Sequence, residues 1–302
     1  MDKEFERLIN SVKVNAIDDS ESSDKLIDAL ISYFVESGKS EEMFGYVLDA
    51  LKASAGCENR YAMYQYSQLV CLTRKSTREQ KLQAIQYGKQ SGFYFGVFYA
   101  AKLLEDPEFR PGPNGYFYNG NAGLLGRHML NEPDFALRQA ADLYQSIADE
   151  AMVAAEEEHG RFQRHILDSA IFAARLYLNK RSFGPGIPIE DWYEEKAVQD
   201  LEFVIRELEE PEEEWENVCV SYAYSILGAY YLEKTEDAEA ADCFVKALEA
   251  NPDSVSYFCR ERINDKGAYD RILATCEKVK SRMSPDGLKG LDTFPYVWNN
   301  WH

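Results

Sequence analysis

Apolar residues recur at helical spacing along most of the chain. Near the N-terminus, five of them include pairs that are three and four residues apart: Leu26, Ile27, Leu30, Ile31 and Phe34. Steps of three and four residues place side chains on one face of an α-helix, so the pattern predicts an amphipathic helix here.

Polar residues and glycines predict where this helix and its neighbour begin and end. Ser22 and Ser23 are expected to cap the first helix, and Gly38 to terminate it. A second helix is expected to begin at Ser40. Its apolar face carries Met43, Phe44, Val47 and Leu51. Residues 1–55 are therefore predicted to form an N-terminal helical cap of two or three helices.

The C-terminal part of the chain is also predicted to be helical. After Pro252, helices are expected around residues 254–263 and 268–283. One face of the second carries Ile272, Cys276 and Val279. Residues 253–302 are thus predicted to comprise C-terminal capping helices and an aromatic tail.

The most specific pattern lies between residues 224 and 252. Eight positions agree with the two-helix pattern W-x2-L-G-x2-Y, then Ala, Phe, Ala and a terminating Pro, with Tyr in place of Trp: Tyr224, Leu227, Gly228, Tyr231, Ala240, Phe244, Ala247 and Pro252. This segment resembles a tetratricopeptide repeat. Small residues at Gly228 and Ala240 would let two antiparallel helices approach closely, and Leu227, Tyr231 and Phe244 would fill the space between them.

Three weaker copies precede this segment. Their paired helices are Ala173-Ala174-x2-Tyr177 with Ala197-x3-Leu201-x2-Val204, Phe95-Gly96-x2-Tyr99 with Ala140-x3-Tyr144-x2-Ile147, and Tyr66-Ser67-x2-Val70 with Ala84. The last is closer to a Sel1-like repeat, since Gly88 and Ser91 replace its large positions. Residues 56–252 are predicted to form about four irregular hairpins with an insertion at 105–133. The resemblance implies an all-α fold, a tetratricopeptide-like right-handed α–α superhelix with helical end caps.

Charge narrows the possible partners. The chain has a formal charge of −19 and a pI near 4.7, which argues against nucleic acid and against an anionic membrane surface. Such acidity keeps a large surface soluble, and it would also suit a basic partner. Neither a signal peptide nor an apolar run long enough to cross a bilayer is evident, so we expect a soluble, cytoplasmic protein.

Cysteine spacing gives no metal or redox motif. The six cysteines contain no C-x2-C pair, and they are interpreted as reduced core residues: Cys57, Cys71, Cys219, Cys243, Cys259 and Cys276.

Two aromatic segments are candidate binding elements. The insertion contains Tyr116, Phe117 and Tyr118, and the tail contains Trp298 and Trp301. Each segment either packs on the protein's own helices or contacts a partner, and the sequence leaves both alternatives open.

Acidic residues are concentrated around Pro211. Seven carboxylates lie within ten residues, at Glu207, Glu209, Glu210, Glu212, Glu213, Glu214 and Glu216. Mutual repulsion favours an exposed turn, which either is simply solvated or steers a basic partner. The same alternatives apply to a second acidic stretch formed by Asp149, Glu150, Glu156, Glu157 and Glu158.

No catalytic or cofactor motif is evident. Glu156-x2-His159 has the spacing of half a di-iron site, but no second Glu-x2-His exists to complete it. We therefore expect no metal, no cofactor and no enzymatic activity.

The sequence instead favours a protein-interaction module, such as an adaptor, a chaperone or an inhibitor, that holds a peptide or partner protein in a concave groove. The resemblance implies that first helices line this groove, with Tyr222, Ser225 and Tyr230 as candidates in the strong repeat. Two alternatives stay open: an enzyme or small-ligand-binding protein with a pocket at residues 106–133, and an acidic immunity-type inhibitor of a basic effector. The oligomeric state is left undetermined.

Overall fold

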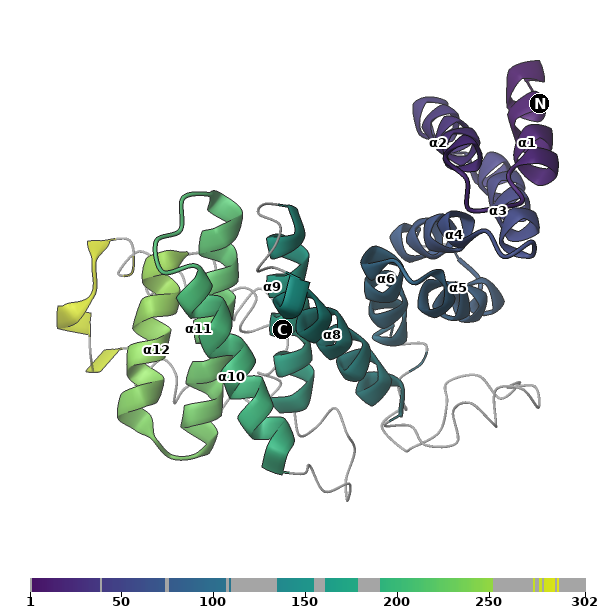
Figure 1. The fold of residues 1–302 in the computed structure, drawn as a ribbon. Coiled ribbons are helices and arrows are strands. Elements are labelled where there is room, and N and C mark those ends of the chain that lie inside the picture. Colours follow the sequence, from purple (N-terminus) through teal and green to yellow (C-terminus); the bar gives the residue numbers. More distant parts are fainter. Residues whose placement is uncertain are drawn as a thin grey trace. The chain divides into compact units, whose positions relative to one another are not determined.

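The computed structural model describes residues 2–38, 40–73, 76–106, 109, 135–154, 161–178, 191–251, and, near the C-terminus, 274, 277, 278, 280–285 and 287. All regular elements in these residues are helices (Figure 1), which confirms the predicted all-α class. The chain divides into two compact units, Met1–Ile147 and Ala148–His302.

In its described residues, the first unit begins with six helices. They are α1 (Lys3–Asn15), α2 (Glu21–Glu36), α3 (Glu41–Ala55), α4 (Arg60–Leu72), α5 (Arg78–Ser91) and α6 (Tyr94–Leu104). The long helix α8 (Phe135–Ala154) spans the boundary between the units. The second unit contains α9 (Arg161–Leu178), α10 (Asp191–Glu207), α11 (Glu214–Glu233), α12 (Asp237–Ala250) and the short 3-10 helix η3 (Lys280–Arg282).

Helices of the first unit pack in two rows. Each of α1 to α5 packs against the helix that follows it, and α4 also packs against α2 and α6. In Figure 1, α2, α4 and α6 follow one another in one row, and α1, α3 and α5 form the other. The row formed by α2, α4 and α6 therefore has one side that faces away from α1, α3 and α5. Residues of both α4 and α6 lie on this side.

Serine residues cap α2 and α3, although the cap of α2 is not the predicted residue. Ser20, rather than Ser22 or Ser23, is the N-cap of α2, and its hydroxyl accepts from the Ser23 amide at 3.3 Å. Ser40 caps α3 as predicted. Gly38 follows the end of α2 with φ of 85°, a left-handed conformation that favours glycine.

Helices α11 and α12 form the predicted hairpin. A Cβ added at Gly228 would lie 2.6 Å from Cε1 of Phe244, so only glycine fits this crossing without displacing the ring. Leu227 and Phe244 are buried, as predicted, Ala240 is buried as well, and Tyr231 is half-buried. Asn251 adopts an extended conformation directly after α12, which ends at Ala250.

Side-chain contacts also pair the helices of the weaker copies. Rings of Tyr177 in α9 and Tyr193 in α10 lie 4.8 Å apart between centroids. Tyr144 of α8 packs against Phe98 of α6 at 5.6 Å, and its hydroxyl donates to Glu105 at 2.8 Å. Packing of α9 on α10 confirms that pair, while the side chain of Tyr144 joins α8 to α6. Membership of a repeat family stays a prediction.

At the weakest copy, small residues make the helix crossing close. A Cβ at Gly88 in α5 would lie 2.7 Å from the Ser67 hydroxyl of α4 and 2.8 Å from Cβ of Ala100 in α6. Gly88 thus allows α5 to contact both neighbours at once.

The described cysteines are free thiols, and they differ in exposure. Cys219 and Cys243 are buried and Cys71 is half-buried, but Cys57 is exposed in the turn after α3. The prediction of a core residue was wrong for Cys57, because α3 ends before it. Cys259 and Cys276 lie outside the described residues.

Membrane insertion receives no support from the helices. Among the described residues, no helix combines the length and the apolar character needed to cross a bilayer.

Replacement of Gly228 by alanine tests the close crossing of α11 and α12. The added Cβ would collide with the buried Phe244 ring, so we expect Gly228→Ala to lower the free energy of unfolding by about 1–3 kcal/mol. Urea unfolding followed by circular dichroism measures this.

Gly45→Ala is the matched control. Gly45 is exposed in the middle of α3, and an added Cβ would meet no atom within 4 Å. Alanine there should stabilise the protein by about 0.5–1 kcal/mol. Equal effects of the two substitutions would contradict the packing described here.

Candidate functional site

One face of α4 and α6 carries five partly exposed aromatic side chains, which we call the aromatic face. Its members are Tyr61 and Tyr64 of α4, Phe93 at the N-cap of α6, and Phe95 and Tyr99 of α6. Tyr64 is central: its ring centroid lies 5.6 Å from that of Tyr61, 5.8 Å from Phe93, 6.2 Å from Phe95 and 6.5 Å from Tyr99. The rings therefore form one continuous cluster.

Helical spacing explains why the rings share a side. Tyr61 and Tyr64 are three residues apart, and Phe95 and Tyr99 are four apart. The opposite side of α4 carries buried residues that pack into the unit, Ala62, Tyr66, Ser67 and Val70. The close crossing at Ser67 and Ala100 lies on the buried side of these helices, which also holds the Tyr66 ring, and the five rings of the aromatic face lie on the other side.

The aromatic face is accessible to solvent. Phe93 and Phe95 are 39% and 37% exposed, and Tyr61, Tyr64 and Tyr99 are half-buried. Clustered aromatic side chains with polar groups at their edges are typical of interaction surfaces.

Hydrogen bonds hold the tyrosine rings in position. The Tyr61 hydroxyl donates to Oδ1 of Asp28 in α2 at 2.6 Å and accepts from Nε2 of Gln65 at 2.9 Å. Nε2 of Gln68 donates to the Tyr99 hydroxyl at 3.1 Å. The surface is therefore ordered before any partner binds, which lowers the entropic cost of association.

Two cationic side chains lie against phenylalanine rings. Cζ of Arg60 is 5.5 Å from the centroid of Phe93, and Nζ of Lys102 is 5.6 Å from that of Phe98. Nε of Arg60 also donates to the Ser91 carbonyl at 2.7 Å. Rings in this region thus accept cations at their faces.

Burial changes the acidity of the tyrosines. It raises the pKa of Tyr64 to about 12, with a smaller contribution from the nearby Tyr99 and Asp28. Burial and the hydrogen bond to Asp28 both raise the pKa of Tyr61. Both phenols stay neutral at physiological pH, so they can act as hydrogen-bond donors.

The three residues of α11 that were predicted to line a groove do not form one cluster: Tyr222, Ser225 and Tyr230 each contact different neighbours. Tyr222 packs at 6.4 Å against Phe172 of α9, and Tyr230 contacts Tyr231 and Lys234. Ser225 is only 3% exposed, and its hydroxyl donates to the Ser221 carbonyl at 2.8 Å. Its burial removes Ser225 from the candidate surface.

Other predicted site residues lie outside the described residues. They are Tyr116, Phe117 and Tyr118 of the insertion, Trp298 and Trp301 of the tail, and the Glu156 and His159 pair. The second acidic stretch is only partly described, at Asp149 and Glu150.

Sequence reasoning missed the aromatic face as a surface. Phe95 and Tyr99 were assigned to packing within a hairpin, and Tyr61, Tyr64 and Phe93 received no role. The signal was present as aromatic residues three and four apart on α4 and α6, two helices that pack against each other.

The acidic turn is confirmed. Helix α10 ends at Glu207 and α11 begins at Glu214, with Glu209 and Glu210 exposed between them. The Glu216 carboxylate accepts from the backbone amides of Glu212 at 2.7 Å and Glu213 at 3.0 Å. These bonds cap the N-terminus of α11, where negative charge is favourable.

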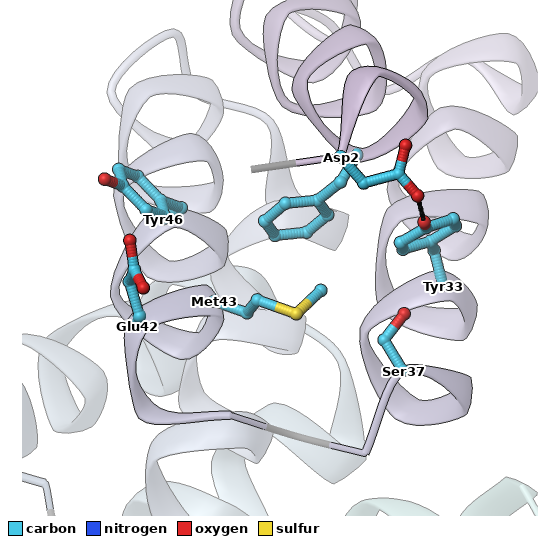
Figure 2. A pocket seen from close by; sticks show the side chains of 7 residues that line it. Asp2, Tyr33, Ser37, Glu42, Met43 and Tyr46 are labelled. Carbon is cyan, nitrogen blue, oxygen red and sulfur yellow. Dashed lines mark hydrogen bonds between the residues drawn. The ribbon is translucent and has the colours of Figure 1, made fainter.

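A pocket of about 290 Å³ lies among α1, α2 and α3 (Figure 2). It is lined by Asp2, Phe5, Tyr33, Ser37, Glu42, Met43 and Tyr46. The Tyr33 hydroxyl donates to the Asp2 carboxylate, and the Phe5 and Tyr33 rings stack at 5.7 Å. Figure 2 shows the Met43 side chain extending into the space between α3 and α2. Its volume lies near the lower end of the range for small-molecule sites, and its lining mixes acidic, aromatic and apolar side chains.

A wider groove occurs in the second unit. It measures about 690 Å³ and is formed by residues of α10, α11 and α12 and of the α10–α11 turn. Tyr224 and Lys246 lie in its lining, with Nζ of Lys246 5.4 Å from the Tyr224 ring centroid. Its lining mixes Lys246 and Arg206 with Glu202, Glu209 and Glu249, so its charge indicates no ligand class.

Metal binding finds no support in the described ranges, where no three His, Cys, Asp or Glu side chains are grouped so as to hold an ion.

Comparison with known proteins gives no relative whose role could be transferred. No family model matches the chain, and no curated protein or solved structure matches it. Any proposal for the function must therefore start from the protein's own surfaces.

The raised pKa of Tyr64 predicts late ionisation in an alkaline titration. Since the folded state holds the phenol neutral to about pH 12, against 10.0 for an ordinary tyrosine, its stabilising contribution is complete below pH 10.0 and disappears as the pH rises through 12. Phenolate absorbance is measured against pH for the wild-type protein and for Tyr64→Phe. The difference between the two curves should show one group that titrates near pH 12.

A difference curve for Tyr64 centred near pH 10.0 would show that its ring is not buried as described.

Proposed function

We propose that the protein is a protein-interaction module that binds a peptide segment of a partner on the aromatic face. The single observation that carries this proposal is the continuous cluster of five partly exposed rings on two adjacent helices. Contiguous exposed patches of apolar side chains are uncommon on monomeric soluble proteins and usually mark interaction sites. Aromatic residues are also the commonest anchors of binding energy in protein interfaces.

The order of the helices supports this proposal. Under this proposal, α4 and α6 are each the first helix of a two-helix repeat of the tetratricopeptide kind. The right-handed α–α superhelix of that family is the arrangement that would turn their shared side into a groove, with α2 extending it. Direct packing of α2 on α4 and of α4 on α6 agrees with such an order.

The chemistry of the aromatic face suits an extended peptide. Phe93 and Phe95 offer apolar area for side chains, while the phenol groups and the Gln68 amide can bond to a peptide backbone. The role would be that of an adaptor, a chaperone or an inhibitor in the cytoplasm. An acidic inhibitor of a basic effector is one form of this proposal.

Selection from a random peptide display library tests the proposal. We expect the full-length protein to enrich peptides whose binding is lost or weakened at least roughly tenfold by Phe95→Ala, because Phe95 offers an exposed ring as an anchor. Fluorescence anisotropy with the selected peptides measures the affinities.

Leu72→Ala is the matched control, since Leu72 is a 68% exposed apolar residue at the end of α4 outside the aromatic face. It should leave binding unchanged. If no selected peptide depends on Phe95, or if both substitutions weaken binding equally, the proposed function is wrong.

A further inference from the structure

The aromatic face has an acidic border, which we call the acidic edge. It consists of Asp19 in the turn before α2, and Asp24 and Asp28 in α2. Asp28 accepts the hydrogen bond from the Tyr61 hydroxyl, and Asp19 accepts from the Arg60 amide at 2.5 Å. Both contacts join the acidic edge directly to the first turn of α4, where the aromatic face begins.

Negative charge at the acidic edge is poorly compensated. Burial raises the pKa of Asp24, and the neighbouring carboxylates of Asp28, Asp19, Asp18 and Glu21 raise it further. Lys25, on the same helix, is bound to Glu21 at 2.6 Å. Within the described residues, neither Asp24 nor Asp28 forms an ion pair with a lysine or arginine. The edge thus presents a local negative potential beside exposed rings.

The protein's own cations show how rings in this region accept charge. Arg60 lies over Phe93, and Lys102 lies over Phe98, at distances typical of cation–π contacts. Phe95 and Tyr64 make ring contacts with each other at 6.2 Å. The side chain of a partner's lysine or arginine could pack its aliphatic part against such rings.

We propose that the segment bound on the aromatic face is basic, with a lysine or arginine whose stem packs on the rings and whose cationic head meets Asp28 at the acidic edge. This inference rests on the proposed function and names the chemistry of its partner. The charge of the site is complementary to such a segment, and the Tyr61 hydroxyl bonded to Asp28 connects the two parts of the site.

Other peptide chemistries fit less well. An acidic segment would be repelled by Asp19, Asp24 and Asp28. A neutral proline-rich segment would stack on the rings but leave the acidic edge without a partner. Only a basic segment uses both parts of the surface.

The test measures three fluorescent octapeptides against the full-length protein by anisotropy: alternating Arg-Leu, alternating Ser-Leu and alternating Glu-Leu. We expect the Arg-Leu peptide to bind tightest and to weaken with added salt. Asp28→Asn should weaken it by roughly fivefold or more, since asparagine still accepts the Tyr61 hydrogen bond but carries no charge. Asp24→Asn should act in the same direction.

Asp49→Asn controls for general attraction to a chain of charge −19, because Asp49 is exposed on α3 in the other row of helices. Its effect on the Arg-Leu peptide should be less than twofold. Equal losses from Asp28→Asn and Asp49→Asn would overturn the inference, since the attraction would then be unspecific.

The peptides enriched in the display selection separate this inference from the proposed function. Selected peptides that are enriched in lysine and arginine, and whose affinity falls in the Phe95→Ala and Asp28→Asn variants, would support the proposed function and the basic segment. Peptides that depend on Phe95 but not on Asp28 would overturn the basic segment and leave the interaction module standing. No dependence on Phe95 would overturn both.

Discussion

Close crossing of helices at small residues is the constraint on which the described architecture depends. In α11 and α12, the missing Cβ of Gly228 leaves room for the Phe244 ring. In the first unit, Gly88 of α5 lies against Ser67 of α4 and Ala100 of α6. Larger side chains at these glycines would separate the helices, because a Cβ added at Gly88 or Gly228 would lie less than 3 Å from atoms of the facing helices. The packing density of the core therefore follows from a few small residues.

The same constraint determines where the aromatic residues lie. Ser67 of α4 and Ala100 of α6 allow both helices to pack closely on α5, and the rings of Tyr64, Phe95 and Tyr99 meet one another on the side away from this crossing. Hydrogen bonds from Gln68 and to Asp28 then fix the phenol groups. Because α2 packs next to α4, its carboxylates border the cluster. An aromatic surface with an acidic border is thus a consequence of helix order, and it gives the proposed binding site its chemistry.

Local features of the fold could be predicted from the sequence, and features that depend on neighbouring helices could not. The hairpin around Gly228 and Phe244 and the turn near Pro211 follow from residue types at short separations, and the structure confirms both. The cap at Ser20 was missed because three serines lie within one turn, and only the extended backbone at Ser20 distinguishes them. The aromatic face was missed because it requires the side-by-side placement of α4 and α6, whose rings are more than 25 residues apart in sequence.

Amide hydrogen exchange of the full-length protein, with and without a peptide from the display selection, tests the central claim most directly. Binding on the aromatic face should slow exchange in residues 60–72 and 93–104 and leave residues 214–250 unchanged, because a bound segment covers α4 and α6 and suppresses their local opening. Protection confined to residues 214–250, or to the pocket among α1, α2 and α3, would contradict the assignment of the binding site to the aromatic face.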